Sequence, residues 1–502
     1  MNNEEMRLPI EGVQTFEKVF IGGEWIAPRG GRLIESIDPA TEEVWTRVAE
    51  SGLEEVDLAV AAARQAMQGP WARYFTASQR GEYLRRFALL LRRDAERIAH
   101  LESRDNGKPL HDTEGEISKA ADWLDFFAGG ADKLNGSQIP VRPDALAFTR
   151  REPIGVVAAI LPWNSPIMMA AWKLGPALAA GNAIILKPAE QTPVSALQLG
   201  RLAQEAGLPP GVVNVLPGYG PVAGAALTTH PGVNKVAFTG DWRTAQKIMQ
   251  AASGSLKRCT FECGGKSPFI VFEDADLDKA LVVGLNSAFR STGQSCSIAS
   301  RIFVQRPIYE RFASAFAERA KAIRVGNPLD AHTHIGPQTS ADQLAKTQRY
   351  IGLGLESGAR LIAGGGRPPG LDRGYFVEPT VFADVRNDSC LAQEEVFGPV
   401  IAMLPFDDEA EAVSLANDSN YGLVAAVWTQ DIKRAHRVAA AVEAGLVCVN
   451  TYGATHWMLP YGGFKLSGIG RENSLESLLE YTEVKSVFVD LSDQRPADRF
   501  AD

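Results

Sequence analysis

The stretch IGVVAAILPWNSPIMMAAWKLGPALAAGNAIILKP, residues 154–188, contains two short apolar runs separated by a longer helical segment. Residues 154–161 and 183–188 are rich in Val, Ile and Leu and have the length of buried strands, whereas residues 166–180 have the length of a helix. A strand, a helix and a strand in this order are typical of a βαβ unit, whose strands lie parallel. The stretch therefore predicts a parallel sheet covered by helices.

The same alternation continues as far as residue 262. Three more strands are expected at residues 212–218, 235–240 and 257–262, and three more helices at residues 193–207, 221–230 and 242–253. A second α/β stretch follows, with strand-like runs in residues 267–283, 301–305 and 444–452. A single sheet would need too many strands to hold them all, so we expect a second α/β domain. Sheets of this kind bind ligands at the carboxyl ends of their strands.

Helical periodicity dominates the region before this core. Apolar residues three and four apart predict one helix at residues 53–68 and a second over residues 77–109, which Gly107 and Pro109 end. The Gly-rich residues 363–375 are expected to form a surface loop, because no helical pattern follows them.

Composition excludes several classes of protein. The chain has 502 residues, more than one core usually supports, and a net charge of −9 without a basic block, which argues against nucleic acid or an anionic membrane as partner. Its start is polar and acidic, unlike a signal peptide, and its apolar runs are too short or too interrupted to span a bilayer. The five cysteines and seven histidines form neither a disulfide framework nor a metal site. We expect a cytoplasmic protein without a bound metal.

Polar side chains follow two neighbouring strands of the expected sheet. Asn164 lies after the first strand on a loop stiffened by flanking prolines, where its amide N–H₂ could donate to an oxyanion; alternatively, it caps the next helix. Lys187 and Glu190 lie at the end of the next strand. In a dinucleotide site an acidic residue there accepts hydrogen bonds from a ribose diol and rejects a 2′-phosphate, whereas the alternative is a solvated ion pair.

Two other segments suit covalent chemistry on a carbonyl group. Glu262 ends a strand among apolar residues, where burial raises the pKa of a carboxyl group and suits it to act as a general base; alternatively, it pairs with a lysine. Cys296 lies in STGQSCSIAS, residues 291–300, a polar segment with a glycine that permits a tight turn. A cysteine nucleophile would form a tetrahedral thiohemiacetal with a carbonyl, whereas the alternative is a packed free thiol.

A further acidic segment is QEEVFGPV, residues 393–400. Its two adjacent carboxylates, followed by Phe397 and a Gly-Pro turn, suit a ribose contact and a surface for packing against a ring. The alternative is an acidic pair on the protein surface. Each of these signals is weak alone, but their joint occurrence in this order is informative.

Together these segments resemble the aldehyde dehydrogenase superfamily. The resemblance runs from about residue 18, in KVFIGGEWIAP, to about residue 490. The matching motifs are PWNSP, WKLGPALAAGN, KPAEQTP, FECGGK, GQSC, EEVFGPV and PYGGFKLSGIGRE. The resemblance implies an NAD-dependent enzyme of the hydrolytic type, which oxidises an aldehyde to a carboxylic acid.

The resemblance also implies a role for each matched residue. Cys296 is expected to form the thiohemiacetal and then a thioester. The side chain of Asn164 and the backbone N–H of Cys296 are expected to form the oxyanion hole, and Glu262 is expected to activate the hydrolytic water. Lys173 and Glu472 match positions that move protons away. The expected contacts of NAD, which should be preferred over NADP, are Trp163, Lys187, Glu190, Gly220, Gly240, Asp241, Gly264, Glu395 and Phe397.

The family organisation implies a Rossmann-like cofactor domain, a catalytic domain and a β-arm for oligomerisation. The dinucleotide-binding domain is expected at residues 1–135 and 154–265, the catalytic domain at 266–465, and the arm at 136–153 and 480–502. Strand-like runs at residues 145–153 and 480–493 have no partner nearby in the sequence, so they could pair with strands of another subunit. The expected assembly is a homodimer or a homotetramer.

The chain departs from the family pattern at Asp241 and Trp242, where relatives usually have small residues facing the pyrophosphate. Two unit charges ~4 Å apart repel by about 4 kcal/mol at an effective dielectric constant of ~20. One hypothesis is therefore that Asp241 weakens or displaces pyrophosphate binding. Alternatively, Asp241 turns outward as a helix N-cap, and the helix dipole and Arg243 offset its charge.

The expected substrate funnel also departs, because Ser165 stands where the family often has an aromatic residue. An aromatic wall facing small hydroxyl groups predicts a medium-sized, partly polar or cyclic aldehyde. A betaine-type aldehyde, which needs an aromatic cage, ranks second because Ser165 removes one wall of the cage. The expected substrate contacts are Ser165, Met169, Trp172, Ser295, Ser297, Thr455, Trp457 and Tyr461.

Two alternatives to the predicted function stay open. One is a CoA-acylating semialdehyde dehydrogenase of the same fold, although such relatives lack the glutamate found here at position 262. The other is a non-catalytic homologue that serves as a binding or structural protein. The joint presence of Cys296, Glu262 and Asn164 argues against it, whereas Asp241 favours it.

Overall fold

The five strands predicted between residues 154 and 262 form the parallel centre of an eight-stranded sheet. In sheet order they are β12 (Arg258–Glu262), β11 (Lys235–Thr239), β8 (Val156–Ile160), β9 (Ala183–Lys187) and β10 (Val213–Val215). The helices that connect them are α6 (Pro166–Ala179), α7 (Val194–Glu205), α8 (Ala225–Thr229) and α9 (Trp242–Ser253). Almost every side chain of these strands is buried, as expected for a parallel sheet covered on both faces.

Short antiparallel strands extend this sheet at both edges. At one edge β10 pairs with β2 (Val19–Ile21), which pairs with β3 (Glu24–Ile26), and at the other edge β12 pairs with β22 (Gly468–Ile469). A separate three-stranded sheet contains β1 (Gln14–Phe16), β5 (Glu43–Ala49) and β4 (Leu33–Asp38). Segments from both ends of the chain thus complete the first α/β unit.

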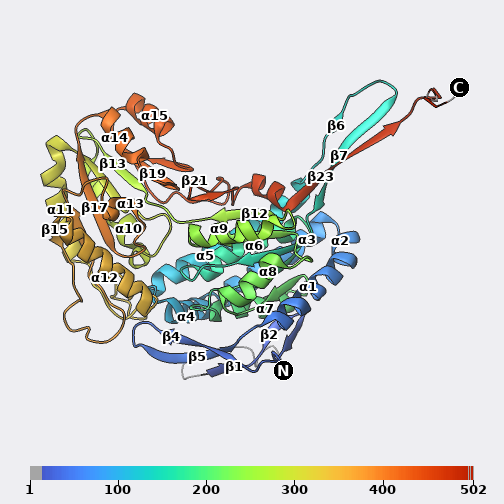
Figure 1. The fold of residues 1–502 in the computed structure, drawn as a ribbon, viewed down its shortest axis with the longest axis horizontal. Coiled ribbons are helices and arrows are strands. Elements are labelled where there is room, and N and C mark those ends of the chain that lie inside the picture. The colour runs from blue at the N-terminus through green and yellow to red at the C-terminus, as the bar shows by residue number, and fades with distance from the viewer. Residues whose placement is uncertain (1–13, 496, 498, 501–502) are drawn as a thin grey trace.

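The second α/β stretch forms its own seven-stranded sheet, as predicted. In sheet order it contains β15 (Arg360–Ala363), β16 (Thr380–Ala383), β17 (Val400–Phe406), β14 (Arg301–Gln305), β13 (Pro268–Val271), β19 (Val424–Trp428) and β20 (Leu446–Val449). All neighbours except β15 and β16 pair in parallel. Helices α10 (Leu277–Phe289), α11 (Tyr309–Lys321) and α12 (Ala341–Glu356) belong to this unit, which lies to one side of the first (Figure 1). The α/β fold class is confirmed.

The helices before the core agree with the prediction except at one break. Helix α1 (Leu53–Gln68) has the predicted bounds, but the expected single helix over residues 77–109 is wrong: α3 (Ala77–Arg93) ends and α4 (Ala95–Asn106) begins at Asp94. The backbone of Asp94 leaves the helical region, and its carboxylate accepts hydrogen bonds from arginines instead. Gly107 ends α4 in the left-handed conformation (φ 82°), and α5 (Leu110–Gly130) follows Pro109.

The strand-like runs near residues 145 and 480 pair with each other, rather than lacking a partner within the chain. β23 (Thr482–Asp490) runs antiparallel to β7 (Ala145–Pro153) along the full length of both strands, and β6 (Gln138–Ile139) pairs with the other edge of β7. The resulting ribbon projects from the body of the molecule (Figure 1). We call these three strands the arm.

The computed structural model describes residues 14–495, 497 and 499–500. The predictions for residues 1–13, and those for residues 496, 498, 501 and 502 at the end of the expected arm, lie outside the described residues. Within the described part of the chain, no helix has both the length and the apolar character that crossing a bilayer requires.

A buried ion pair fixes the helix break against the sheet. Asp94 pairs with Arg201 of α7, and both side chains are 2% exposed. Burial raises the pKa of Asp94, but hydrogen bonds from Arg93 and Arg201 more than offset this, so the pKa lies well below its usual range. The lowered pKa stabilises the fold above about pH 4, and this stabilisation is lost as the pH falls further.

We predict that Asp94→Asn destabilises the fold by about 1.5–3 kcal/mol at pH 7, because it removes one of the two carboxylates that pair with the buried Arg201 and leaves only Glu205. Thermal unfolding at pH 7 should show a lower midpoint for the variant, and the difference should shrink at pH 3. Asp132→Asn is the matched control, because Asp132 pairs with Lys133 on the surface. Equal midpoints for Asp94→Asn and wild type would contradict the prediction.

Candidate functional site

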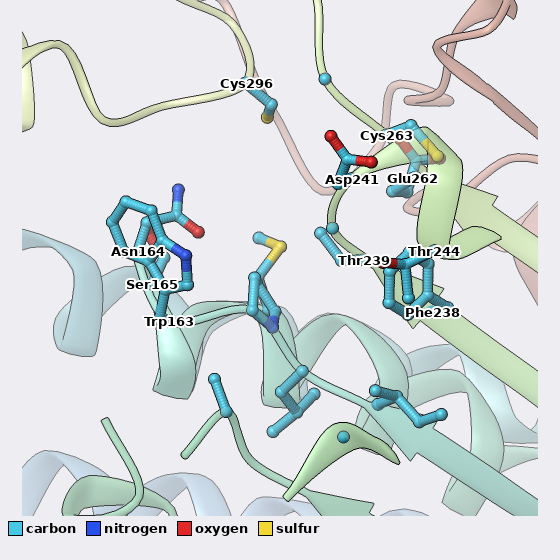
Figure 2. Close-up of a pocket in the computed structure, with 18 of the residues that line it drawn as sticks. Trp163, Asn164, Ser165, Phe238, Thr239, Asp241, Thr244, Glu262, Cys263 and Cys296 are labelled. Carbon is cyan, nitrogen blue, oxygen red and sulfur yellow. The ribbon is translucent and has the colours of Figure 1, made fainter. Parts of the chain in front are cut away.

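One cavity of about 750 Å³ lies where the carboxyl ends of the first sheet meet the second α/β unit. Asn164, Glu262 and Cys296, which come from three separate segments, surround it together (Figure 2). The other predicted residues that line it are Trp163, Ser165, Met169, Trp172, Lys187, Glu190, Gly220, Gly240, Asp241, Gly264, Ser295, Ser297, Glu395, Phe397, Thr455 and Tyr461. Three predicted residues do not line it, namely Lys173, Trp457 and Glu472.

A strained loop presents Cys296 to the cavity. Ser291, Thr292 and Gly293 are all in the left-handed region, with φ between 51° and 70°, which is uncommon for three successive residues. The Thr292 backbone carbonyl accepts a hydrogen bond from the side chain of Gln338 (3.2 Å), and a Cβ on Gly293 would lie 2.3 Å from the backbone of Gly398. The surrounding backbone therefore fixes this loop and requires glycine at position 293.

The Cys296 thiol is protonated at rest. Its Sγ lies 3.7 Å from the hydroxyl oxygen of Tyr461. Burial raises the pKa of Cys296 to about 11, although the hydrogen bond with Tyr461 lowers it, and the negative charges of Glu262 and Glu395 raise it further. A nucleophilic thiolate must therefore form within the site when substrate and cofactor bind.

Asn164 is tied to the loop that carries Cys296 and is not the N-cap of the following helix. Its Nδ2 donates one hydrogen bond to the backbone carbonyl of Gln294 (2.9 Å), which ties it to the loop that carries Cys296. Because an amide N–H₂ has two hydrogens, the second is free to donate into the cavity. The N-cap of α6 is Ser165, so the capping alternative for Asn164 does not hold.

Glu262 lies at the end of β12 as a buried carboxyl group. Its Oε2 has no hydrogen-bond partner among the residues that the structure describes. Burial, and after it the negative charge of Glu472, raise the pKa of Glu262 well above its usual range, while Lys173 lowers it in part. Lys173 itself pairs with Glu472 (Nζ–Oε1 2.8 Å), and among the described residues no lysine forms an ion pair with Glu262. The arrangement suits a general base.

The other half of the cavity fits a dinucleotide. Lys187 is buried and its Nζ lies 3.1 Å from Oε2 of Glu190, which is partly exposed to the cavity. A Cβ on Gly220 would meet no atom within 4 Å, so the backbone there is open to a bulky group. This set offers a carboxylate and an ammonium group to a ribose, with open space beside them.

Glu395 and Phe397 form the inner part of this half. Glu395 accepts a hydrogen bond from the backbone N–H of Gly265 (3.0 Å), and burial raises its pKa to about 7. The Phe397 ring packs edge-on against Trp163 at a centroid distance of 5.1 Å. The alternative of a solvated surface pair therefore does not describe Glu395.

Asp241 caps a helix, as in the second alternative, but it lines the cavity rather than turning away from it. It is the N-cap of α9, and its Oδ1 accepts a hydrogen bond from the backbone N–H of Arg243 (2.8 Å). Its Oδ2 lies 3.4 Å from the Arg243 guanidinium, and the side chain is 46% exposed. The N-cap hydrogen bond and the Arg243 guanidinium both offset the negative charge of Asp241, which favours undisturbed pyrophosphate binding. Weaker pyrophosphate binding caused by Asp241 stays a hypothesis.

Aromatic rings form one wall of the substrate half. Trp172 packs against Tyr461 with ring centroids 5.1 Å apart, and Trp123 stacks on Trp172 at 5.8 Å. Trp123 lines the cavity, whereas the predicted Trp457 packs behind it at 5.5 Å. Trp123 was not predicted because its position in α5 reads as one more apolar residue of a helix.

Polar side chains also line the substrate half of the cavity. Ser165 Oγ accepts a hydrogen bond from Nζ of the buried Lys108 (3.1 Å), which also pairs with Glu116. Because this bond uses the hydroxyl oxygen as acceptor, the Ser165 O–H is free to donate into the cavity. Sequence reasoning missed Lys108 and Glu116, since both lie in helical or loop segments far from the motifs.

Comparison with known proteins gives consistent matches. A model of the aldehyde dehydrogenase family matches residues 25–487. The chain is 45% identical over 476 residues to an aldehyde dehydrogenase from Emericella nidulans, covering 95% of both proteins. It is 45% identical to the NAD+ complex of aldehyde dehydrogenase from Bacillus cereus, with a TM-score of 0.93 over 95% of this chain and 97% of that one. A betaine aldehyde dehydrogenase from Staphylococcus aureus in complex with NAD+ is 37% identical, with a TM-score of 0.95 over 97% of each chain.

We predict slow alkylation of Cys296 by iodoacetamide at pH 7 without cofactor, because a thiol with a pKa of about 11 is ionised in only about one molecule in 10⁴. The rate should rise about tenfold per pH unit from pH 6.5 to 9.5. Tyr461→Phe should slow it further, because it removes the hydrogen bond that lowers the pKa of the thiol. Site-specific mass spectrometry measures the modification, and a plateau near pH 8 would refute the prediction.

Proposed function

This chain belongs to the aldehyde dehydrogenase family, and we propose that it uses NAD to oxidise a medium-sized, partly polar or cyclic aldehyde to a carboxylic acid. The observation that carries this proposal is the meeting of Cys296, Asn164 and Glu262 around one cavity. They offer a nucleophile, an oxyanion donor and a general base.

In the proposed mechanism Cys296 attacks the aldehyde carbonyl after losing its proton, and the carbon–sulfur bond gives a thiohemiacetal. The free N–H of Asn164 and the backbone N–H of Cys296 stabilise the oxyanion. Bound NAD supplies a hydride acceptor. The thioester that results on Cys296 is attacked by a water molecule, whose proton Glu262 accepts, and the carbon–sulfur bond breaks to release the acid.

Lys187, Glu190, Glu395 and Phe397 would hold the cofactor in this proposal. Glu190 and Glu395 present carboxylate oxygens to the two riboses, and the carboxylate of Glu190 disfavours a 2′-phosphate, which supports NAD over NADP. Similarity to proteins that are known as NAD+ complexes supports the same choice.

The aromatic and polar side chains of the substrate half support the proposed substrate class. The rings of Trp123, Trp172 and Tyr461 suit an apolar or cyclic body, while the Ser165 hydroxyl can donate to an oxygen of the substrate. A betaine-type aldehyde is the second candidate, and similarity to a betaine aldehyde dehydrogenase favours it. The ammonium group of Lys108 beside Ser165 is paired with Glu116, so it does not decide against a quaternary ammonium, but Ser165 leaves the aromatic cage without one wall.

The two alternative functions, a CoA-acylating dehydrogenase and a non-catalytic homologue, make different predictions for the residues of the site. Glu262, which a CoA-acylating enzyme would not need, favours hydrolysis as the fate of the thioester. A non-catalytic homologue would have no reason to hold Cys296 on a strained loop beside an aligned amide donor. Both features support the hydrolytic enzyme.

We predict that NAD and a panel of functionalised and cyclic aldehydes give NADH, that Cys296→Ala abolishes this activity, and that CoA does not accelerate it. Glu262→Gln should retain a first burst of NADH but lower the steady-state rate by about 10²-fold or more, because the base acts after hydride transfer. NADH fluorescence on rapid mixing measures both phases. Faster turnover with CoA, or short linear alkanals far ahead of the other aldehydes, would contradict the proposal.

We also propose that the arm joins two copies of the chain. β23 is an edge strand of the three-stranded arm sheet, and its Val484 and Phe488 are 52% and 57% exposed. Exposed apolar side chains on a projecting edge strand need a cover in solution, and a second copy supplies it. The assembly is then a homodimer or a homotetramer built on this contact.

We predict that Phe488→Glu shifts the protein towards the monomer, because a charge on the edge strand opposes its burial between copies. Analytical ultracentrifugation measures the shift at micromolar concentrations. Leu89→Glu is the matched control, because Leu89 is 63% exposed on α3, away from the arm. Equal sedimentation of the two variants would count against the arm as the interface.

A further inference from the structure

Two positively charged side chains line the cavity but take no part in the proposed mechanism. Lys119 and Arg290 both lie on its wall, and both are exposed to solvent. A side chain that lines a cavity and is also exposed lies where the cavity opens to solvent. We call Lys119 and Arg290 together the basic rim.

The position of Lys119 on α5 assigns it to the substrate half. Glu116, Lys119 and Trp123 follow one another at spacings of three and four residues and all line the cavity, so one face of α5 presents them. Trp123 belongs to the aromatic wall, and Lys119 lies about one helical turn before it. The Lys119 ammonium group thus extends the substrate half towards solvent.

Arg290 approaches the same half from the second α/β unit. It is the C-cap of α10 and begins the segment that leads to Cys296. Burial raises the pKa of the Cys296 thiol, and the positive charge of Arg290 lowers it in part. The Arg290 guanidinium therefore lies within electrostatic reach of the nucleophile, on the side of the cavity that receives the aldehyde.

The carboxylates near the basic rim are engaged elsewhere. Within the described part of the chain, neither cation of the rim forms an ion pair or a side-chain hydrogen bond. Glu116 pairs with the buried Lys108. Asp112 accepts a hydrogen bond from the backbone N–H of Ser291 (3.2 Å) and does not line the cavity. The rim thus presents two positive charges that can bind an anion.

We propose that the substrate carries a carboxylate at the end remote from its aldehyde group, and that the basic rim binds this carboxylate. The inference rests on the proposed function and narrows its substrate class. The planar guanidinium of Arg290 can donate two parallel hydrogen bonds to a carboxylate, and the ammonium group of Lys119 adds a second positive charge. The aromatic wall then contacts the part of the substrate that joins its two ends.

The charge of the whole chain supports selection at the basic rim. The net charge is −9, so the molecule as a whole repels an anion. Two cations without a partner at the opening of the cavity reverse this effect locally and attract an anionic aldehyde. The same charges repel a quaternary ammonium group, so the inference disfavours a betaine-type aldehyde.

Paired substrates test the inference. The acids para-carboxybenzaldehyde and para-formylphenylpropanoic acid are each compared with the methyl ester, which keeps the ring and removes the charge. With wild type, kcat/KM of the better acid should exceed that of its ester by about tenfold, mainly through a lower KM, because the carboxylate is bound equally before and during the reaction. Added salt should reduce this advantage, because it screens exposed charges.

Variants of the rim are compared by the ratio of kcat/KM for acid and ester. Arg290→Gln should lower this ratio about tenfold, and Lys119→Gln by a smaller factor, since an ammonium group lacks the bidentate geometry. A change in the reactivity of Cys296 affects acid and ester alike and cancels in the ratio. Arg290→Glu should lower the ratio below one, because it repels the carboxylate. Arg311→Gln is the matched control, because Arg311 is an exposed arginine of α11 that does not line the cavity.

The outcomes also separate this inference from the proposed function. If wild type forms no NADH with the acids, the esters or any other aldehyde, the proposed function fails. If wild type oxidises the esters as well as the acids, the inference is overturned and the proposed function stands. It is likewise overturned if Arg290→Gln and Lys119→Gln both keep the wild-type ratio, or if betaine aldehyde has a higher kcat/KM than both acids.

Discussion

The parallel pairing of β8, β9, β11 and β12 is the constraint on which the rest of the site depends. Because parallel strands have their carboxyl ends at one edge of the sheet, the residues after each strand meet there although they are far apart in sequence. Asn164, Lys187, Asp241 and Glu262 reach one cavity for this reason. The later part of the chain supplies Cys296, on its strained loop, together with Glu395, Phe397, Thr455 and Tyr461.

Burial sets the chemistry of the assembled site. It raises the pKa values of Cys296 and Glu395 to about 11 and about 7, and that of Glu262 well above its usual range. These shifts all have burial as their largest cause, so the few polar donors that reach the cavity act in surroundings where water does not weaken them. The Asn164 amide illustrates this, because one of its N–H groups is anchored to the Gln294 carbonyl and the other is free.

The sequence predicted the parallel core and most of the cavity because both depend on local patterns. Five strands and the connecting helices follow from short runs of apolar residues, and Cys296, Glu262 and Asn164 follow from motifs at strand ends or turns. Tertiary contacts decided the rest. Arg201 breaks the predicted second helix by binding Asp94, and β2 and β22, with three and two residues, are too short to show a period. Trp123 replaces Trp457 in the cavity wall because a ring stack between distant helices decides which ring faces inward.

The same register places polar side chains on the buried face behind Glu262. Setting Glu262 opposite Thr239 at the strand ends also sets Thr260 and Lys235 on the same buried face, two and four positions before them. The interior face of a parallel sheet is normally apolar, and Val, Ile and Ala fill the corresponding positions of β8 and β9. Apolar residues at Thr260 and Lys235 would keep the fold and avoid the cost of unpartnered polar atoms. Their presence therefore costs stability that apolar residues at the same two positions would not cost.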